Sequence, residues 1–205
     1  TQLLMKDAPV KTGADLKGKT IRATGAFVPA LKSQGAATVS MSQPKVYEAL
    51  SNGSVDGSTT YYYVAKAYKH YEVAKHITEL NMGQVLAFGV AMNANTYNSL
   101  KPDQQKLLDE LGMEFTVYMA EKMHASRTDV KKELQEGIDG NKVEVVEPDP
   151  ALRAKLIEIA DADVSNWIEK AKKKGMDGDA VLADYKSLVE KYTKERDDKG
   201  YPWAR

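Results

Sequence analysis

Short β-type and helix-type patterns alternate along residues 15–63. Residues 20–24 (TIRAT) have the β-rich composition of a strand, and residues 38–41 and 55–57 predict two more short strands. Between these strands, residues 28–34 and 44–50 predict short helices, which end at Gly35 and at an Asn-Gly pair. Because strands that alternate with helices form βαβ units, this block predicts an α/β domain with a parallel sheet.

The same kind of pattern flanks this block on both sides. Residues 1–5 predict a strand, and residues 76–80 predict another. Apolar positions within residues 64–75 recur on one helical face and predict a helix. The mostly apolar residues 84–93 predict a buried central strand.

Long amphipathic patterns dominate the second half of the chain. Within residues 103–136 apolar residues recur every four positions, with a polar gap at Ser126 and Arg127. A continuous helix of that length spans roughly 50 Å at 1.5 Å per residue, so we expect it to connect two lobes. Residues 142–146 predict a strand, whereas residues 151–174 and 179–196 predict two more helices.

These patterns divide the chain into three parts. Residues 1–93 form the predicted α/β lobe, residues 94–141 the region of the long connecting helix, and residues 142–205 a strand with C-terminal helices that pack on the lobes. The polar tail, residues 197–205, is expected to be loosely held, with Tyr201 and Trp203 able to dock on a surface.

Composition removes several classes of function. The 29 basic and 29 acidic residues balance, so charge indicates no nucleic-acid or membrane-surface partner. The chain has no cysteine, and its three histidines lack metal-ligand spacing. No P-loop, GxSxG or HExxH motif is present, so we expect no metal, no cofactor and no catalytic residue. No apolar run approaches the roughly 20 residues of a membrane span.

Ligands of parallel sheets bind beyond the carboxyl ends of the strands. Arg22 lies near one such end, and residues 58–63 come directly after another predicted strand. A guanidinium group is planar, always charged, and presents paired donors that match a carboxylate. From the residues alone, however, a solvated strand arginine is the alternative for Arg22, a helix N-cap the alternative for Thr60, and core packing the alternative for Phe27.

Several motifs in register resemble one family. DLKGKTIR occupies residues 15–22, VYEALSNGSVDG residues 46–57, and YEVAKHIT residues 71–78. The apolar stretch 84–93 and DQQKLLDEL, residues 103–111, follow in the family's order. In these motifs the chain resembles the solute-binding receptors of tripartite ATP-independent periplasmic (TRAP) transporters.

The resemblance implies a periplasmic-binding-protein-like (type II) second lobe, a long lobe-spanning helix and a helical C-terminal part. It implies a non-enzymatic receptor in the periplasm, which closes on a small organic acid and delivers it to the permease subunits in the membrane. Family members carry an N-terminal lobe before the first crossing strand, and this chain lacks it. We therefore expect a truncated chain, without its signal peptide, whose exposed face is available for dimerisation.

The resemblance also implies roles for individual residues. Arg22 matches the family's carboxylate-clamping arginine. Thr60 stands where the family has a ligand-contacting asparagine, Gln43 where it has an aromatic residue, and Gln2 where many members have a second arginine. The predicted ligand-binding residues are Arg22, Phe27, Gln43, Thr60, Tyr61, Tyr62, Tyr63, Phe88 and Asn93.

Two other functions stay open at this point. One is a ligand-sensing or effector-binding domain that feeds a signalling partner. The other is an enzyme that uses the same cleft, for which the sequence offers no nucleophile–base pair.

Overall fold

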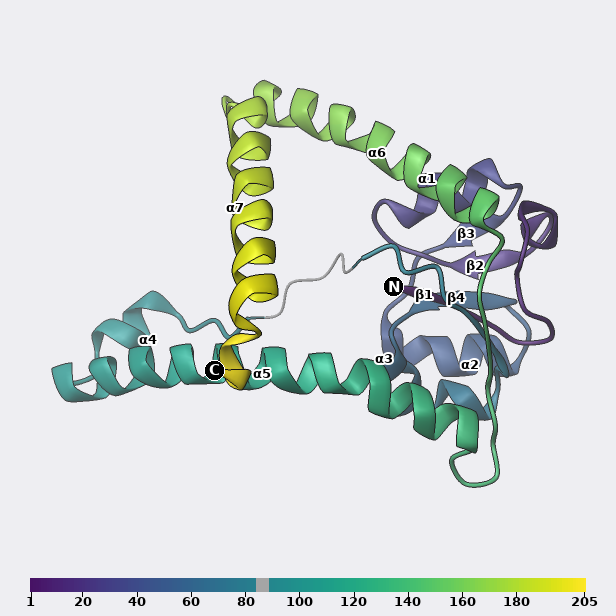
Figure 1. The fold of residues 1–205 in the computed structure, drawn as a ribbon, viewed down its shortest axis with the longest axis horizontal. Coiled ribbons are helices and arrows are strands. Elements are labelled where there is room, and N and C mark those ends of the chain that lie inside the picture. The colour runs from purple at the N-terminus through teal and green to yellow at the C-terminus, as the bar shows by residue number, and fades with distance from the viewer. Residues whose placement is uncertain (84–88) are drawn as a thin grey trace. The chain divides into compact units, whose positions relative to one another are not determined.

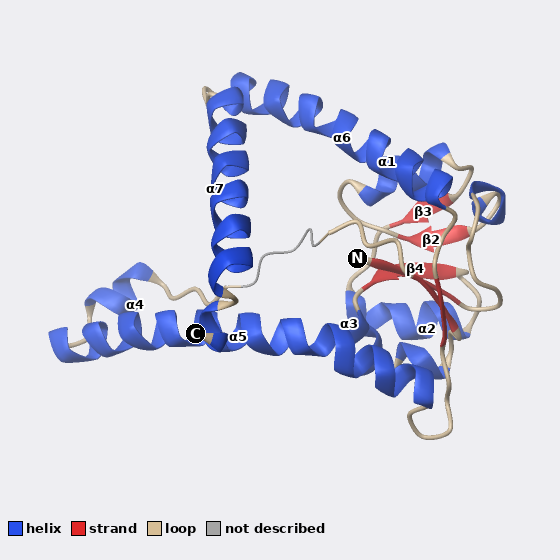
Figure 2. Cartoon of the chain, in the orientation of Figure 1, coloured by secondary structure: helices blue, strands red, loops and turns tan. Residues whose placement is uncertain are grey.

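The computed structural model describes residues 1–83 and 89–205 (Figure 1). Figure 2 shows the same chain coloured by helix and strand. The strands are β1 (Gln2–Met5), β2 (Thr20–Arg22), β3 (Ala37–Val39), β4 (Gly57–Thr60), β5 (His76–Thr78) and β6 (Glu144–Val146). The helices are α1 (Phe27–Ser33), α2 (Val46–Ser51), α3 (Tyr62–Ala67), α4 (Ala94–Asn98), α5 (Pro102–Glu136), α6 (Pro150–Lys173) and α7 (Gly178–Lys199).

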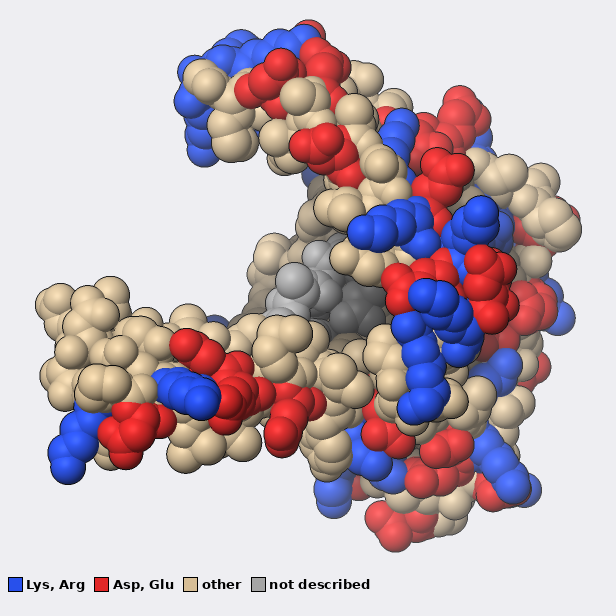
Figure 3. Space-filling model, turned by 60° about the vertical axis from the view of Figure 1, so that its left-hand side comes forward, with Lys and Arg blue, Asp and Glu red and all other residues tan. Residues whose placement is uncertain are grey.

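The chain forms two compact units. Unit 1 consists of Thr1–Val85 and Ser126–Gly178, and unit 2 of Leu86–Ala125 and Asp179–Arg205. The sheet and the helices that cover it belong to unit 1. None of the described helices is long and apolar enough to cross a membrane. On the face drawn in Figure 3, basic and acidic side chains are interspersed, in keeping with the zero net charge.

The six strands form one mixed sheet in the order β3-β2-β4-β1-β5-β6. Strand β1 pairs antiparallel with both β4 and β5, whereas the other neighbours in the sheet pair in parallel. The parallel sheet predicted for residues 15–63 is therefore confirmed for β2, β3 and β4, whereas β1, which precedes that block, runs antiparallel to its neighbours. The chain passes from β1 to β2 through a loop with one short 3-10 helix, Gly13–Leu16, so no crossover helix forces these two strands to run in parallel.

Helices cover both faces of the sheet (Figure 1). The alternation of side chains along β1 shows the two layers. Leu3 and Met5 point into the core formed with α1 and α6, whereas Leu4 points into the core formed with α2, α3 and the last turns of α5. Each of these three side chains is at most 2% exposed. Burial of a side chain of this size contributes about 2 kcal/mol.

Local signals explain where the long helices begin and end. Pro102 occupies the first position of α5, where its missing N–H costs no hydrogen bond. The helix ends before Gly137, whose φ of 109° lies outside the range that other residues readily adopt. The predicted continuous helix is thus confirmed. Helix α6 begins after Asp149, whose carboxylate accepts a hydrogen bond from the Ala151 N–H at 2.7 Å.

Three predicted elements differ from the structure. Strand β4 covers Gly57–Thr60 rather than 55–57, so the residues expected to follow the strand form most of it. The predicted helix over 64–75 is split into α3 and the 3-10 helix His70–Glu72, because Lys69 adopts a left-handed conformation with φ of 55°. Of the predicted strand 84–93, residues 84–88 lie outside the described residues. Residues 89–93 form no strand.

The tail is better held than its polarity predicts. Helix α7 continues to Lys199, and the ring of Tyr201 stacks on that of Trp203 with centroids 4.6 Å apart. The Tyr201 ring also lies 4.5 Å from the ring of His124. The predicted docking of these aromatic residues is confirmed within unit 2.

Candidate ligand-binding site

The carboxyl ends of the parallel strands meet at one edge of the sheet, which we call the carboxyl edge. Because β1 runs antiparallel, its first residue, Gln2, also lies there, opposite Thr60 of β4. Arg22 ends β2, and Glu79 directly follows β5. Polar or charged residues that are buried in the sheet and along this edge are Gln2, Arg22, Ser58, Thr59, Thr60, His70, Thr78 and Glu79. Burying polar groups costs free energy unless they are hydrogen-bonded. The polar side chains of this edge therefore stabilise the fold only where they find hydrogen-bond partners.

Arg22 is held rigidly at this edge. Its Nε and Nη2 atoms donate hydrogen bonds to the Met41 carbonyl oxygen, at 3.0 and 2.9 Å, and the residue is only 8% exposed. Burial lowers the pKa of the Arg22 guanidinium. Within residues 1–83 and 89–205, no carboxylate forms an ion pair with it. The protein therefore buries a cation that a ligand carboxylate can neutralise.

His70 and Gln43 lie near Arg22. His70 is fully buried, and neither of its ring nitrogens makes a hydrogen bond of normal geometry to a described residue; the same is true of the Gln43 Oε1 atom. Burial lowers the pKa of His70 to about 4, with a smaller contribution from the Arg22 charge, while the Gln43 backbone partly opposes this shift. At neutral pH the ring is therefore neutral. Buried polar groups normally form hydrogen bonds. The His70 ring nitrogens and Gln43 Oε1 are therefore available to form hydrogen bonds beside Arg22.

The three consecutive tyrosines have different environments. The rings of Tyr61 and Tyr63 stack in parallel, with centroids 5.4 Å apart. Burial raises the pKa of the Tyr63 hydroxyl to about 12, so that hydroxyl stays protonated. Tyr62, in contrast, points into the core and is 3% exposed, and its hydroxyl donates to the Glu79 Oε1 atom at 2.5 Å.

Glu79 is the centre of a buried network. Its Oε2 atom accepts a hydrogen bond from Lys131 Nζ at 2.7 Å, and its Oε1 atom accepts from Tyr62. Burial alone would raise the pKa of Glu79, but hydrogen bonds from Lys131, Tyr62 and Glu147 more than offset it and hold that pKa below its usual range. The shared hydrogen bond raises the pKa of Glu147 in turn. Sequence reasoning missed this network, because nothing in the local pattern links residues 62, 79 and 131.

The other predicted contacts are spread over the molecule. Phe27 is 3% exposed and packs in the core beside α6, and the Thr60 hydroxyl donates to the Tyr61 carbonyl oxygen at 3.2 Å. Asn93, in unit 2, caps α4 by accepting a hydrogen bond from the Asn95 N–H at 2.9 Å. Phe88 lies outside the described residues. The structure thus brings Arg22, Gln43 and Thr60 to the region of the carboxyl edge, and the ligand roles of all nine residues stay predictions.

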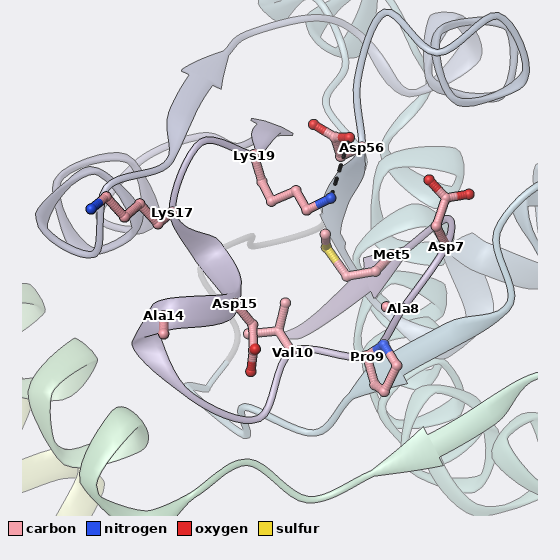
Figure 4. A pocket seen from close by; sticks show the side chains of 10 residues that line it. All are labelled: Met5, Asp7, Ala8, Pro9, Val10, Ala14, Asp15, Lys17, Lys19 and Asp56. Carbon is pink, nitrogen blue, oxygen red and sulfur yellow. Dashed lines mark ion pairs between the residues drawn. The ribbon is translucent and has the colours of Figure 1, made fainter.

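A separate pocket of about 300 Å³ lies at the opposite edge of the sheet (Figure 4). Its charged residues carry both signs, and Lys19 Nζ lies 3.9 Å from Asp56 Oδ1. The lining consists of Met5, Asp7, Ala8, Pro9, Val10, Ala14, Asp15, Lys17, Lys19 and Asp56. None of the predicted ligand contacts lines it.

Solved structures with the same fold define the class. A TRAP solute-binding protein from Rhodoferax ferrireducens T118, in complex with copurified benzoate, is 26% identical, with a TM-score of 0.80; the match covers 94% of this chain and 61% of that one. A TRAP periplasmic solute-binding protein from Desulfovibrio salexigens DSM2638 is 31% identical, with a TM-score of 0.67; the match covers 97% and 59%. The fold is therefore that of a TRAP solute-binding protein, as the resemblance predicted.

Sequence comparison leads to the same family. A solute-binding protein from Sulfitobacter sp. (strain NAS-14.1) is 34% identical over 149 residues, which cover 72% of this chain and 44% of the relative. The family described as bacterial extracellular solute-binding protein, family 7, matches residues 2–171. The chain belongs to this family. It spans less than two thirds of the length of the relatives named here.

Proposed function

We propose that this protein binds a small organic-acid anion at the carboxyl edge and delivers it, outside the cytoplasm, to the membrane permease of a TRAP transporter. The observation that carries this proposal is the environment of Arg22. Its guanidinium is 8% exposed, is oriented by two hydrogen bonds to one carbonyl oxygen, and pairs with no carboxylate in the described part of the chain. A carboxylate ligand would supply the missing counter-ion and bind at the remaining N–H donors.

The ligands of two relatives support a carboxylate. The Rhodoferax ferrireducens protein binds benzoate, and in the Desulfovibrio salexigens protein the C-terminus of a symmetry mate occupies the ligand-binding site. A benzoate ion and a chain terminus share little beyond a carboxylate group, and that is the group that Arg22 is suited to hold.

We further propose that the ligand is bound and released unchanged. In the described part of the chain the ring nitrogens of His70 make no hydrogen bond and His76 Nδ1 pairs with Glu144 Oε2 at 2.8 Å, so neither contact pairs a histidine with a hydroxyl nucleophile. Mass spectrometry of the acid after prolonged incubation with the protein is expected to show no product.

Calorimetric titration with benzoate and with small aliphatic acids tests the binding. We expect at least one acid to bind, and Arg22→Gln to weaken that binding about 100-fold, because truncating a buried charge partner costs about 2–5 kcal/mol. Arg22→Lys should restore only part of the affinity, since an ammonium group lacks the paired donors. Lys19→Gln is the matched control, because that cation lies at the opposite edge of the sheet and its side chain is 39% exposed.

Equal binding by the wild type and Arg22→Gln would contradict the proposal, and so would failure of every acid to bind. Urea unfolding of each variant shows whether a loss of binding reflects a loss of folding.

A further inference from the structure

The pocket at the opposite edge of the sheet lies where two neighbouring strands begin. Lys19 directly precedes β2 and Asp56 directly precedes β4, and these strands pair in parallel, with Ile21 opposite Gly57. The Thr20 N–H donates to Asp56 Oδ2 at 2.7 Å, and the Asp56 N–H donates to the Thr20 carbonyl oxygen, also at 2.7 Å. Strand pairing therefore fixes where the side chains of Lys19 and Asp56 start, and both line the pocket.

Lys19 and Asp56, which we call the charge pair, are only loosely bound to each other. Lys19 Nζ lies 3.9 Å from Asp56 Oδ1, which is longer than a hydrogen bond. Within residues 1–83 and 89–205, neither of these two atoms forms a hydrogen bond. Exposed ion pairs contribute little to stability, so a ligand that separates the charge pair disrupts little. Both groups are therefore available to a ligand.

The charges of the pocket indicate which net charge its ligand has. Two lysines and three aspartates line it. The carboxylate of Asp15 is used by its own turn, since its Oδ2 atom accepts a hydrogen bond from the Thr12 N–H at 2.8 Å. Asp7 pairs with no basic residue in the described part of the chain, and the Lys17 ammonium points away from the charge pair (Figure 4). Without Asp15, positive and negative charges are equal in number, which favours a ligand with both charges and no net charge.

Apolar side chains form the rest of the pocket. Met5 and Val10 are buried, and the Met5 side chain lies between the charge pair and Val10 in Figure 4. The other apolar residues of the lining are Ala8, Pro9 and Ala14. Sites for small molecules are mostly apolar, with a few placed polar groups, and their volumes begin at roughly 300 Å³. At about 300 Å³, this pocket suits a small molecule that carries an apolar group.

We propose that this pocket is a second binding site, separate from the carboxyl edge, for a small zwitterion with an apolar side chain, such as an aliphatic α-amino acid. The carboxylate of the zwitterion binds Lys19, its ammonium group binds Asp56, and its side chain packs on Met5 and Val10. Because both charges of an α-amino acid are attached to one carbon atom, they reach both members of the charge pair together. A ligand with a single charge would separate the pair and leave one member without a partner.

L-leucine and two matched analogues test the proposal. Isocaproate is leucine without its ammonium group, and isopentylamine is leucine without its carboxylate. Heteronuclear NMR titrations of the Arg22→Gln variant measure all three, so that binding of an acid at Arg22 does not interfere. We expect leucine to bind about 10-fold more tightly than either analogue, the usual effect of one hydrogen bond to a charged group. The largest shifts should occur at the backbone N–H groups of residues 14–19 and 56.

Variants of the charge pair locate the binding. Lys19→Gln and Asp56→Asn should each weaken leucine binding about 10-fold, since each removes one charge. Asp56→Asn keeps an oxygen that can accept the hydrogen bond from the Thr20 N–H, so the beginning of β2 stays held. The control is Lys6→Gln, which should leave leucine binding unchanged. Lys6 does not line the pocket, and its Nζ atom donates to the Ser51 carbonyl oxygen at 3.4 Å.

Three outcomes would overturn the second site: no saturable shifts with leucine, equal affinity for leucine and either analogue, or leucine binding that both charge variants leave unchanged. If leucine binds the wild type but not Arg22→Gln, the zwitterion occupies the carboxyl edge. The second site then fails and the proposed function stands. If leucine binds at the charge pair while every acid of the first titration fails to bind, the second site stands and the proposed function fails.

Discussion

The two edges of the sheet differ in how deeply their charged side chains are buried. At the carboxyl edge, Arg22 and Glu79 are 8% and 7% exposed, and each is held by specific hydrogen bonds. At the opposite edge, the side chains of Lys19 and Asp56 are 39% and 35% exposed and form a loose pair at 3.9 Å. Exposed pairs contribute little to stability, whereas a buried charge is costly to place and costly to disturb. The difference indicates that a substitution of a charged residue should be more costly at the carboxyl edge than at the opposite edge.

The largest effect on stability is expected for Glu79. Glu79→Ala removes the acceptor of both Tyr62 and Lys131, so we expect the free energy of unfolding to fall by about 3 kcal/mol or more. Urea unfolding monitored by circular dichroism measures the change. In a double-mutant cycle with Lys131→Ala, the coupling energy should exceed about 1 kcal/mol. A loss no larger than that of an exposed pair would remove the contrast between the two edges.

The next effect depends on pH and involves His70. Its pKa is about 4 in the folded protein and ordinarily 6.5, so the unfolded chain binds a proton first as the pH falls. The contribution of His70 to the free energy of unfolding is therefore fully present above pH 6.5. It decreases as the pH falls from 6.5 to 4, and the total decrease is about 3 kcal/mol. His70→Phe keeps an aromatic ring against Tyr68 and should remove this part of the pH dependence. Identical pH profiles of the variant and the wild type, recorded by thermal unfolding, would contradict the assignment.

The smallest effect is expected at the opposite edge. The Asp56 Oδ2 atom accepts a hydrogen bond from the Thr20 N–H at 2.7 Å, so Asp56→Ala should lower the free energy of unfolding by about 1 kcal/mol. Lys19→Ala loses only the exposed pair and should change it by less than about 0.5 kcal/mol. Neither variant should alter the affinity of the carboxyl edge for its acid. A loss at Asp56 as large as that at Glu79 would show that the two edges do not differ.

Local patterns predicted the elements well and the contacts between distant residues poorly. The β-rich composition around Arg22, together with the DLKG motif, placed that residue at the end of a strand, where the structure has it. Tyr62 was predicted to line a pocket, because its sequence position cannot reveal that its hydroxyl meets Glu79, 17 residues later. Arg127 lies in the polar gap of the long helix, and the apolar stripe predicts no contact for it. Such an interruption marks the place where a helix face leaves the core.

The central position of β1 also has a consequence for the rate of folding. The first strand of the chain pairs with β4 and β5, so Leu4 finds its partners only at Ser58 and Ile77. Each of these pairings closes a long loop before any contact compensates for the lost entropy. During synthesis β1 cannot pair with β4 or β5 until those later strands have emerged. We therefore expect slow folding, with a rate set by the closure of these loops rather than by the formation of the helices, and an early species prone to pairing with strands of other chains.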